Sequence, residues 1–220
     1  MNSQNKLLLL TGLFIVCLAA ANILSGAKLV HIFGYTIDAG IICYPLTFLF
    51  SDTISEVWGK KTARTVIWVG FCANLLMVLL IWLGGVLPAS PEWWTNQETY
   101  KSLLGSVPRI VFASMTAYLI SQHHDVFAFH FWRRKTNGRF LWMRNTLSTT
   151  VSQALDTIAF GFIAFYGVLP LGVLVGEIIF VQYLIKLSVA LLDTPFCYLL
   201  IGWCRGFEPQ NTPVKIAGQM

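Results

Sequence analysis

The stretch TVIWVGFCANLLMVLLIWLGGVL, residues 65–87, contains no charged residue and no proline. A helix over these residues is about 35 Å long, enough to cross the roughly 30 Å hydrocarbon core of a bilayer. The rest of the chain has the same character: of 220 residues 56% are hydrophobic and 11% are charged, and the mean hydropathy is +0.66. Soluble domains carry about 25% charged residues. The composition therefore argues against a disordered chain, a disulfide scaffold and a nucleic-acid module, and predicts an all-α integral membrane protein.

Five further stretches extend this pattern, so we expect one polytopic membrane domain over residues 1–220. Six transmembrane helices are predicted, at about residues 7–26, 38–56, 65–87, 107–129, 145–167 and 173–203. The last is longer than the bilayer requires and must tilt, kink at Pro195 or leave the membrane. The first has small residues at 19–21 that resemble a signal-peptide cleavage site, but its apolar run continues through Leu24, so we expect it to be retained.

The loops between these stretches differ in charge. Eleven of the fifteen Lys and Arg residues fall in alternate loops and at the two termini: Lys6, Lys60, Lys61, Arg64, Arg133, Arg134, Lys135, Arg139, Arg144, Arg205 and Lys215. Because basic loops stay on the cytoplasmic side, both termini are predicted to be cytoplasmic. The formal net charge of +5 then reflects topology, and no nucleic-acid partner is expected.

Motifs of enzymatic chemistry are missing from the sequence. It has no phosphate-binding G-x-x-x-x-G-K-[ST], no H-E-x-x-H and no G-x-S-x-G. His123, His124 and His130 sit at the end of a predicted helix beside a basic loop, which favours a solvated helix end over a metal site. The five cysteines form no C-x-x-C pair and are expected to be reduced. We expect no enzyme, no bound cofactor and no metal.

Charged residues inside the predicted spans are the informative signal. Asp156 and Lys186 fall near the middle of the fifth and sixth spans. Each would cost about 2.5–3.5 kcal/mol if it faced lipid. The simplest arrangement brings them close enough to compensate one another, directly or through a ligand. A purely structural buried ion pair is the rival interpretation.

Other polar residues recur at helical spacing within the spans and predict a shared interior face. They are Asp52, Glu56, Ser114, Tyr118, Gln122, Asn145 and Gln182, whereas Asn74 stands alone at the middle of the third span. Aligned polar stripes on several helices describe the polar cavity that a small-solute permease needs. Two structural alternatives stay open: small and polar stripes also hold helices together, and the carboxylates at 52 and 56 could pair with Lys60, Lys61 and Arg64.

A short internal similarity predicts a repeat. Asp52-Thr53-Ile54 in the second span recurs as Asp156-Thr157-Ile158 in the fifth. These spans are expected to run in opposite directions, as a weak three-plus-three inverted repeat requires.

Several spaced motifs resemble one family. Residues 51–61, SDTISEVWGKK, resemble the D-x-x-x-E-x-[YW]-G-[KR] signature of the queuosine precursor transporter family, also called the vitamin uptake transporter family. Arg109, Ser114, Tyr118 and Gln122 fit its fourth-helix pattern, Asn145 and Asp156 its fifth, and Lys186 with Asp193-Thr194-Pro195 its sixth. The resemblance covers about residues 20–205.

This resemblance implies a six-helix inner-membrane importer of 7-cyano-7-deazaguanine or 7-aminomethyl-7-deazaguanine. A guanine-like edge offers N–H donors to a carboxylate and a carbonyl to Lys, Asn or Gln. We expect Asp156 or Asp52 to accept from the donor edge. The expected donors are Gln122, Asn145, Gln182 and Lys186, and the expected stacking wall is Tyr118, Phe48 or Phe160.

The energy source and the oligomeric state do not follow from the sequence. Membrane carboxylates would allow proton coupling, whereas the family also resembles the substrate-binding subunits of ATP-driven vitamin importers. A non-transporting accessory subunit would use the same polar stripes to dock a partner. An intramembrane enzyme using Asp52, Glu56 and Arg64 lacks a nucleophile or metal constellation in this sequence.

Overall fold

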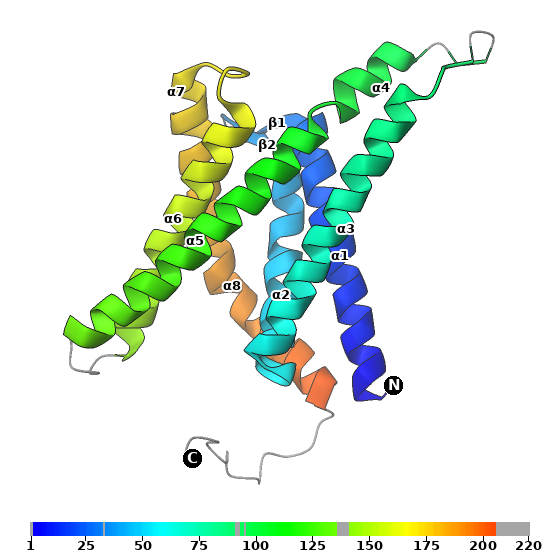
Figure 1. Ribbon diagram of the computed structural model, residues 1–220. Coiled ribbons are helices and arrows are strands. Elements are labelled where there is room, and N and C mark those ends of the chain that lie inside the picture. Colours follow the sequence, from blue (N-terminus) through cyan, green and yellow to red (C-terminus); the bar gives the residue numbers. More distant parts are fainter. Residues whose placement is uncertain (1, 33, 91–92, 95, 136–140, 206–220) are drawn as a thin grey trace.

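The computed structural model describes residues 2–32, 34–90, 93–94, 96–135 and 141–205, and it is a bundle of long helices with one small hairpin (Figure 1). The elements are α1 (Ser3–Ala27), β1 (Leu29–Ile32), β2 (Tyr35–Asp38), the 3-10 helix η1 (Ala39–Cys43), α2 (Tyr44–Trp58), α3 (Lys60–Val86), α4 (Gln97–Leu104), α5 (Val107–Lys135), α6 (Leu141–Phe165), α7 (Leu171–Val173), the π-helix η2 (Leu174–Ile179) and α8 (Phe180–Arg205).

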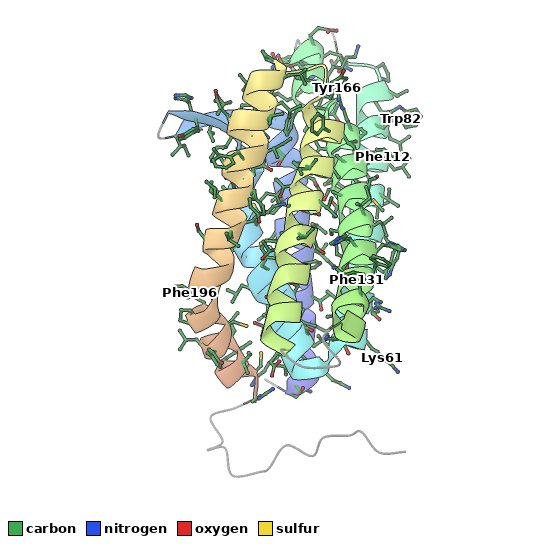
Figure 2. All side chains as sticks on the ribbon, turned by 90° about the vertical axis from the view of Figure 1, so that its left-hand side faces the viewer. Lys61, Trp82, Phe112, Phe131, Tyr166 and Phe196 are labelled. Carbon is green, nitrogen blue, oxygen red and sulfur yellow. The ribbon has the colours of Figure 1, made fainter. Side chains whose placement is uncertain are left out.

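The described helices fit a membrane protein. Four helical segments are long and apolar enough to cross a bilayer: Ser3–Ala27, Lys60–Val86, Gln97–His124 and Leu171–Val189. A shorter apolar helix covers Thr150–Phe165. Figure 2 shows Trp82, Phe112 and Phe196 on the flanks of the bundle, and these side chains are 58%, 64% and 59% exposed. Large apolar side chains exposed on this scale suit hydrocarbon rather than water. The chain is therefore a multi-pass membrane protein.

The second predicted helix begins later than expected. Residues 38–43 are not α-helical: Asp38 ends β2 and η1 follows it. The Asp38 carboxylate accepts from the backbone N–H of Gly40 at 3.1 Å, as an N-cap does, so the chain turns there. Pro45 then lies in the first turn of α2, where a missing N–H costs nothing.

Three elements were not predicted from the sequence. The β1–β2 hairpin pairs Leu29 with Asp38 and Ile32 with Tyr35, and it occupies a segment expected to be a loop. The eight-residue α4 lies in the predicted outer loop, and its Tyr100 hydroxyl donates to the Ile81 carbonyl of α3 at 2.7 Å. The π-helix η2 interrupts the sixth predicted span. All three are too short for hydropathy to reveal.

Both ends of the described chain lie at one end of the bundle (Figure 1). Lys6 Nζ donates to the carbonyls of Trp203 and Cys204 at 2.7 and 3.2 Å. Trp58 Nε1, at the α2–α3 corner, donates to Ser3 Oγ at 3.1 Å. The corner itself turns at Gly59, whose φ of +87° strains any other residue. Lys6, the α2–α3 corner with Lys60 and Lys61, and Arg205 therefore share one end of the bundle, which we call the basic end.

The buried apolar core has two parts. One joins α5, α6 and η2 at the end away from the basic end, with Ile110, Phe160 and Ile178 among its members. The other joins α1, α2, α3 and the last turn of α8 near the basic end, with Phe14 and Ile54 at its centre. Several polar side chains outside these two clusters are buried too, among them Asn22, Asp38, Asn74, Gln182 and Lys186.

Candidate functional site

Asp38 is the most completely buried acidic side chain in the described part of the chain, with no exposed area. It stands where β2 meets η1. Ser25 Oγ of α1, the Gly40 backbone N–H and Gln182 Nε2 of α8 all donate to its carboxylate. All three groups are donors, and an ionised carboxylate, which can only accept, suits them. Asp38 thereby ties the hairpin to two helices.

Lys186 forms the second half of the cluster. Its Nζ lies 2.8 Å from Asp156 Oδ2 and 3.3 Å from Thr157 Oγ1, both on α6. The Lys186 side chain is 4% exposed and that of Asp156 is 24% exposed. The predicted proximity of Asp156 and Lys186 is confirmed.

One face of α8 joins the two halves. Gln182 and Lys186 are four residues apart, so they lie one above the other on the same helix face, and both are buried. The Lys186 ammonium lies 5.2 Å from the centre of the Tyr44 ring and acts electrostatically on Asp38. We call Asp38, Tyr44, Asp156, Gln182 and Lys186 the central cluster; it contains two carboxylates and one ammonium.

Gln182 has an unusual hydrogen-bonding state. Its Nε2 donates to Asp38, whereas its Oε1 is buried and meets no donor among the described residues. The residue has no exposed area, so water does not reach this oxygen directly. A buried acceptor without a donor is costly and rare in proteins. Gln182 Oε1 is therefore an unused acceptor within the described part of the protein.

Two predicted site residues have structural partners instead. Asn74 is buried between α1 and α3, where its Oδ1 accepts from Asn22 Nδ2 at 2.7 Å. The Arg109 guanidinium donates to the Ile163 and Tyr166 carbonyls at 2.7 and 2.6 Å, which caps the end of α6. Both contacts match the helix-joining alternative.

The other predicted residues lie on α2, α5 and α6. Glu56 is exposed and pairs with Arg205 at 3.2 Å, rather than with the cations of the α2–α3 corner. Asp52 and Gln122 are exposed on α2 and α5. Ser114 and Tyr118 are half-buried on α5, and the Tyr118 ring packs edge-on against Phe71 of α3. Asn145 is in α6, and its side chain lies outside the described part of the structure.

Asp38, Ser25 and Tyr44 were missed from the sequence. The prediction puts residue 38 at the first position of a helix, where a charge can face water at little cost. The hairpin that turns the carboxylate inward leaves no hydropathy signal. One signal in the sequence could have indicated the site. Asp38 is a charged residue that stands directly before an apolar run, and this run contains Cys43-Tyr44-Pro45.

The arrangement can bind a small polar solute. It offers carboxylate and amide acceptors, an ammonium donor and an aromatic face within a membrane bundle. Ionisable groups at this depth in a bundle mark solute or ion pathways. Fold and site together define a polytopic membrane protein with a charged interior, the class to which transporters belong.

Comparisons with known proteins give the family. The family described as "putative vitamin uptake transporter" matches residues 38–200, so the match begins at Asp38. A "probable queuosine precursor transporter" of Bacillus subtilis is 36% identical over 78% of this chain and 74% of its own length. The "queuosine precursor transporter" of Escherichia coli is 30% identical over 62% of this chain and 59% of its own length. A "probable queuosine precursor transporter" of Haemophilus influenzae is 29% identical over 70% of this chain and 63% of its own length.

The chain therefore belongs to the vitamin uptake transporter family, whose matched relatives carry the name queuosine precursor transporter. It is a membrane transporter and not an enzyme. No solved structure matches it.

Proposed function

We propose that this protein imports queuosine precursors, 7-cyano-7-deazaguanine or 7-aminomethyl-7-deazaguanine, across the bacterial inner membrane into the cytoplasm. The relatives' names support the substrate class. The observation that carries the proposal is the central cluster: the buried Lys186 ammonium pairs with Asp156 and lies against the Tyr44 ring, and one turn away on α8 Gln182 binds the buried Asp38 carboxylate. A 7-deazaguanine presents N–H donors, a carbonyl and a flat face, and each has a partner in this set.

The base binds at the bundle centre in this proposal. Lys186 donates to the base carbonyl, and Tyr44 stacks against the ring system. Asp156 is the counter-ion of Lys186, because an unpaired ammonium in this buried place would destabilise the fold. This role differs from the one expected from the sequence, in which Asp156 accepts hydrogen bonds from the base.

Six crossings with cytoplasmic termini remain the proposed topology. The α2 helix has 15 residues and is about 22 Å long, too short to cross by itself. The five residues of η1 add about 10 Å, which brings the second crossing close to the hydrocarbon thickness. The basic end then faces the cytoplasm.

The three-plus-three repeat also stays a proposal, with one structural support. Thr53 of α2 and Thr157 of α6 are both fully buried, and both bond back to their own helix. Both also meet α8: Thr53 Oγ1 lies 3.8 Å from Cys197 Sγ, and Lys186 donates to Thr157. Corresponding residues of the two triplets thus flank one helix.

An uptake assay tests the function. A strain that cannot make the precursor base receives the wild-type gene or a variant, and queuosine in its tRNA is measured after feeding either base. We expect Asp156→Ala and Lys186→Ala to abolish the signal at normal protein levels. Glu98→Ala, which breaks an exposed ion pair with Lys101 on α4, is the matched control and should keep it. Wild-type uptake by both cluster variants would place the site elsewhere.

The energy source is tested in the same strain. A protonophore at constant ATP should stop uptake if the carboxylates couple transport to protons. Uptake that survives the protonophore, together with an ATPase module that co-purifies with the protein, would instead make the chain the substrate-binding subunit of an ATP-driven importer. Absence of any base binding by the purified protein would favour an accessory subunit.

A further inference from the structure

Gln182 presents two different groups to the centre of the bundle. Its Nε2 is used, because it donates to the Asp38 carboxylate. Its Oε1 is buried and has no donor in the described part of the protein. The neighbouring Asp38 has one oxygen, Oδ1, held by Ser25 Oγ and the Gly40 N–H, whereas Gln182 alone among the described groups donates to Oδ2. A carboxylate oxygen accepts two bonds, so Oδ2 keeps one place.

We propose that Asp38 and Gln182 together read the ring N–H and the exocyclic amine of the substrate base, and so make the transporter select 2-amino-6-oxo bases. This inference rests on the proposed import of 7-deazaguanines. Gln182 Oε1 and Asp38 Oδ2 are the two acceptors. Lys186, one turn along the same face of α8, is the donor for the 6-oxo group.

The arrangement of hydrogen-bond donors and acceptors on the protein favours 2-amino-6-oxo bases over other purine-like bases. On the protein, Gln182 Oε1 accepts from the exocyclic amine of the base and Asp38 Oδ2 accepts from its ring N–H. Lys186 donates to its carbonyl. A hypoxanthine-type base lacks the amine and leaves Gln182 Oε1 unpaired. An adenine-type base places a ring-nitrogen lone pair against the Asp38 carboxylate, which is repulsive. Sites that leave buried polar groups unpaired or opposed reject the wrong ligand most strongly.

Asp38 suits this reading better than Asp156. The charge of Asp156 is already compensated by Lys186 at 2.8 Å, and its side chain is partly exposed. Asp38 contacts only neutral donors and is fixed from two sides. The fixation needs Gly40, because a Cβ there would clash with Ser25 Oγ and the Ala21 carbonyl. A rigidly placed acceptor gives the sharpest discrimination.

Binding measurements on the purified protein in detergent test the proposal. The probes are 7-deazaguanine and 7-deazahypoxanthine, which differ only in the exocyclic amine. We expect the unaltered protein to bind 7-deazaguanine about tenfold more tightly. In Gln182→Leu, 7-deazaguanine should lose that factor while 7-deazahypoxanthine keeps its affinity, so the ratio falls to about one.

Gln153→Leu is the matched control. Gln153 of α6 also has a buried Oε1 without a donor among the described residues, but it is not one of the described groups that donate to Asp38. Its replacement should leave the ratio unchanged. An equal effect of Gln153→Leu and Gln182→Leu would overturn the assignment, as would a Gln182→Leu protein that still prefers 7-deazaguanine tenfold.

A second variant covers the case in which Gln182→Leu does not fold. Asp38→Asn keeps the side-chain shape and replaces an acceptor by a donor, which suits the ring nitrogen of 7-deazaadenine. The preference for 7-deazaguanine over 7-deazaadenine should fall at least tenfold, and an unchanged preference overturns the proposal. An unaltered protein that binds 7-deazaguanine and 7-deazahypoxanthine equally overturns this inference but not the proposed import. A protein that neither binds nor imports any 7-deazaguanine overturns both.

Discussion

The charge count of the central cluster predicts that its ammonium matters more for stability than its second carboxylate. Three donors point at the Asp38 carboxylate and Asp156 pairs with Lys186 at 2.8 Å, so we take both carboxylates as ionised: two negative charges face the one positive charge of Lys186. In Lys186→Met both carboxylates remain, and no other cation of the described residues forms an ion pair with either. In Asp156→Asn the ammonium and Asp38 remain, and their charges compensate one another. Each variant removes one charge, but Lys186→Met should destabilise the fold more than Asp156→Asn does.

The size of the two effects follows from burial and geometry. Removing one partner of a buried ion pair costs about 3–5 kcal/mol, and the 24% exposure of Asp156 places Lys186→Met near the lower limit, about 3 kcal/mol. Asp156→Asn keeps a side-chain oxygen for Lys186 Nζ and loses only the charge assistance, about 1 kcal/mol. For a chain of this length the melting temperature falls by about 6–12 °C in the first variant and about 2–4 °C in the second.

Thermal unfolding of the detergent-purified protein, followed by the fluorescence of its eight tryptophans, measures both values. Lys101→Met is the control, because it removes the ammonium of an exposed ion pair and should not shift the transition measurably. If Asp156→Asn lowers the melting temperature as much as Lys186→Met does, Asp38 does not carry the charge assigned to it and the reasoning fails.

Three further changes have separate readouts. Arg109→Leu uncaps the end of α6 and should cost about 1–2 kcal/mol in thermal unfolding; lost uptake with unchanged unfolding would return Arg109 to the substrate site. Asn74→Leu leaves the Asn22 amide without its partner and should cost about 1–3 kcal/mol, part of which the double Asn22→Leu/Asn74→Leu variant recovers; strictly additive costs would exclude the bond. Glu177→Leu removes the acceptor of the Thr36 backbone N–H, 2.6 Å away, so deuterium exchange at Thr36 should become severalfold faster; unchanged exchange would show that the hairpin is held elsewhere.

Much of the polar interior could be predicted from residue type and spacing. Asp156 and Lys186 each predict an opposite charge nearby, because either one alone is too costly to leave in lipid. Helical periodicity alone places Gln182 on the same face as Lys186. The same reasoning could not separate binding residues from helix-joining ones. Asn74 and Arg109 are as polar as Gln182, and only their partners show that they connect α1 to α3 and α5 to α6.

The sequence by itself determined that this is a helical membrane protein and that a charged pair lies inside the bundle. Those properties depend on hydropathy, on charge distribution and on the cost of burying a charge, and each can be read along one chain. Only the tertiary structure brought Asp38 into the interior. A four-residue strand pair has no hydropathy signature, and the turn at Gly40 that points the carboxylate at Ser25 and Gln182 depends on how closely η1 approaches α1. The partner of a buried polar group is set by packing between distant segments, and no local pattern encodes that choice.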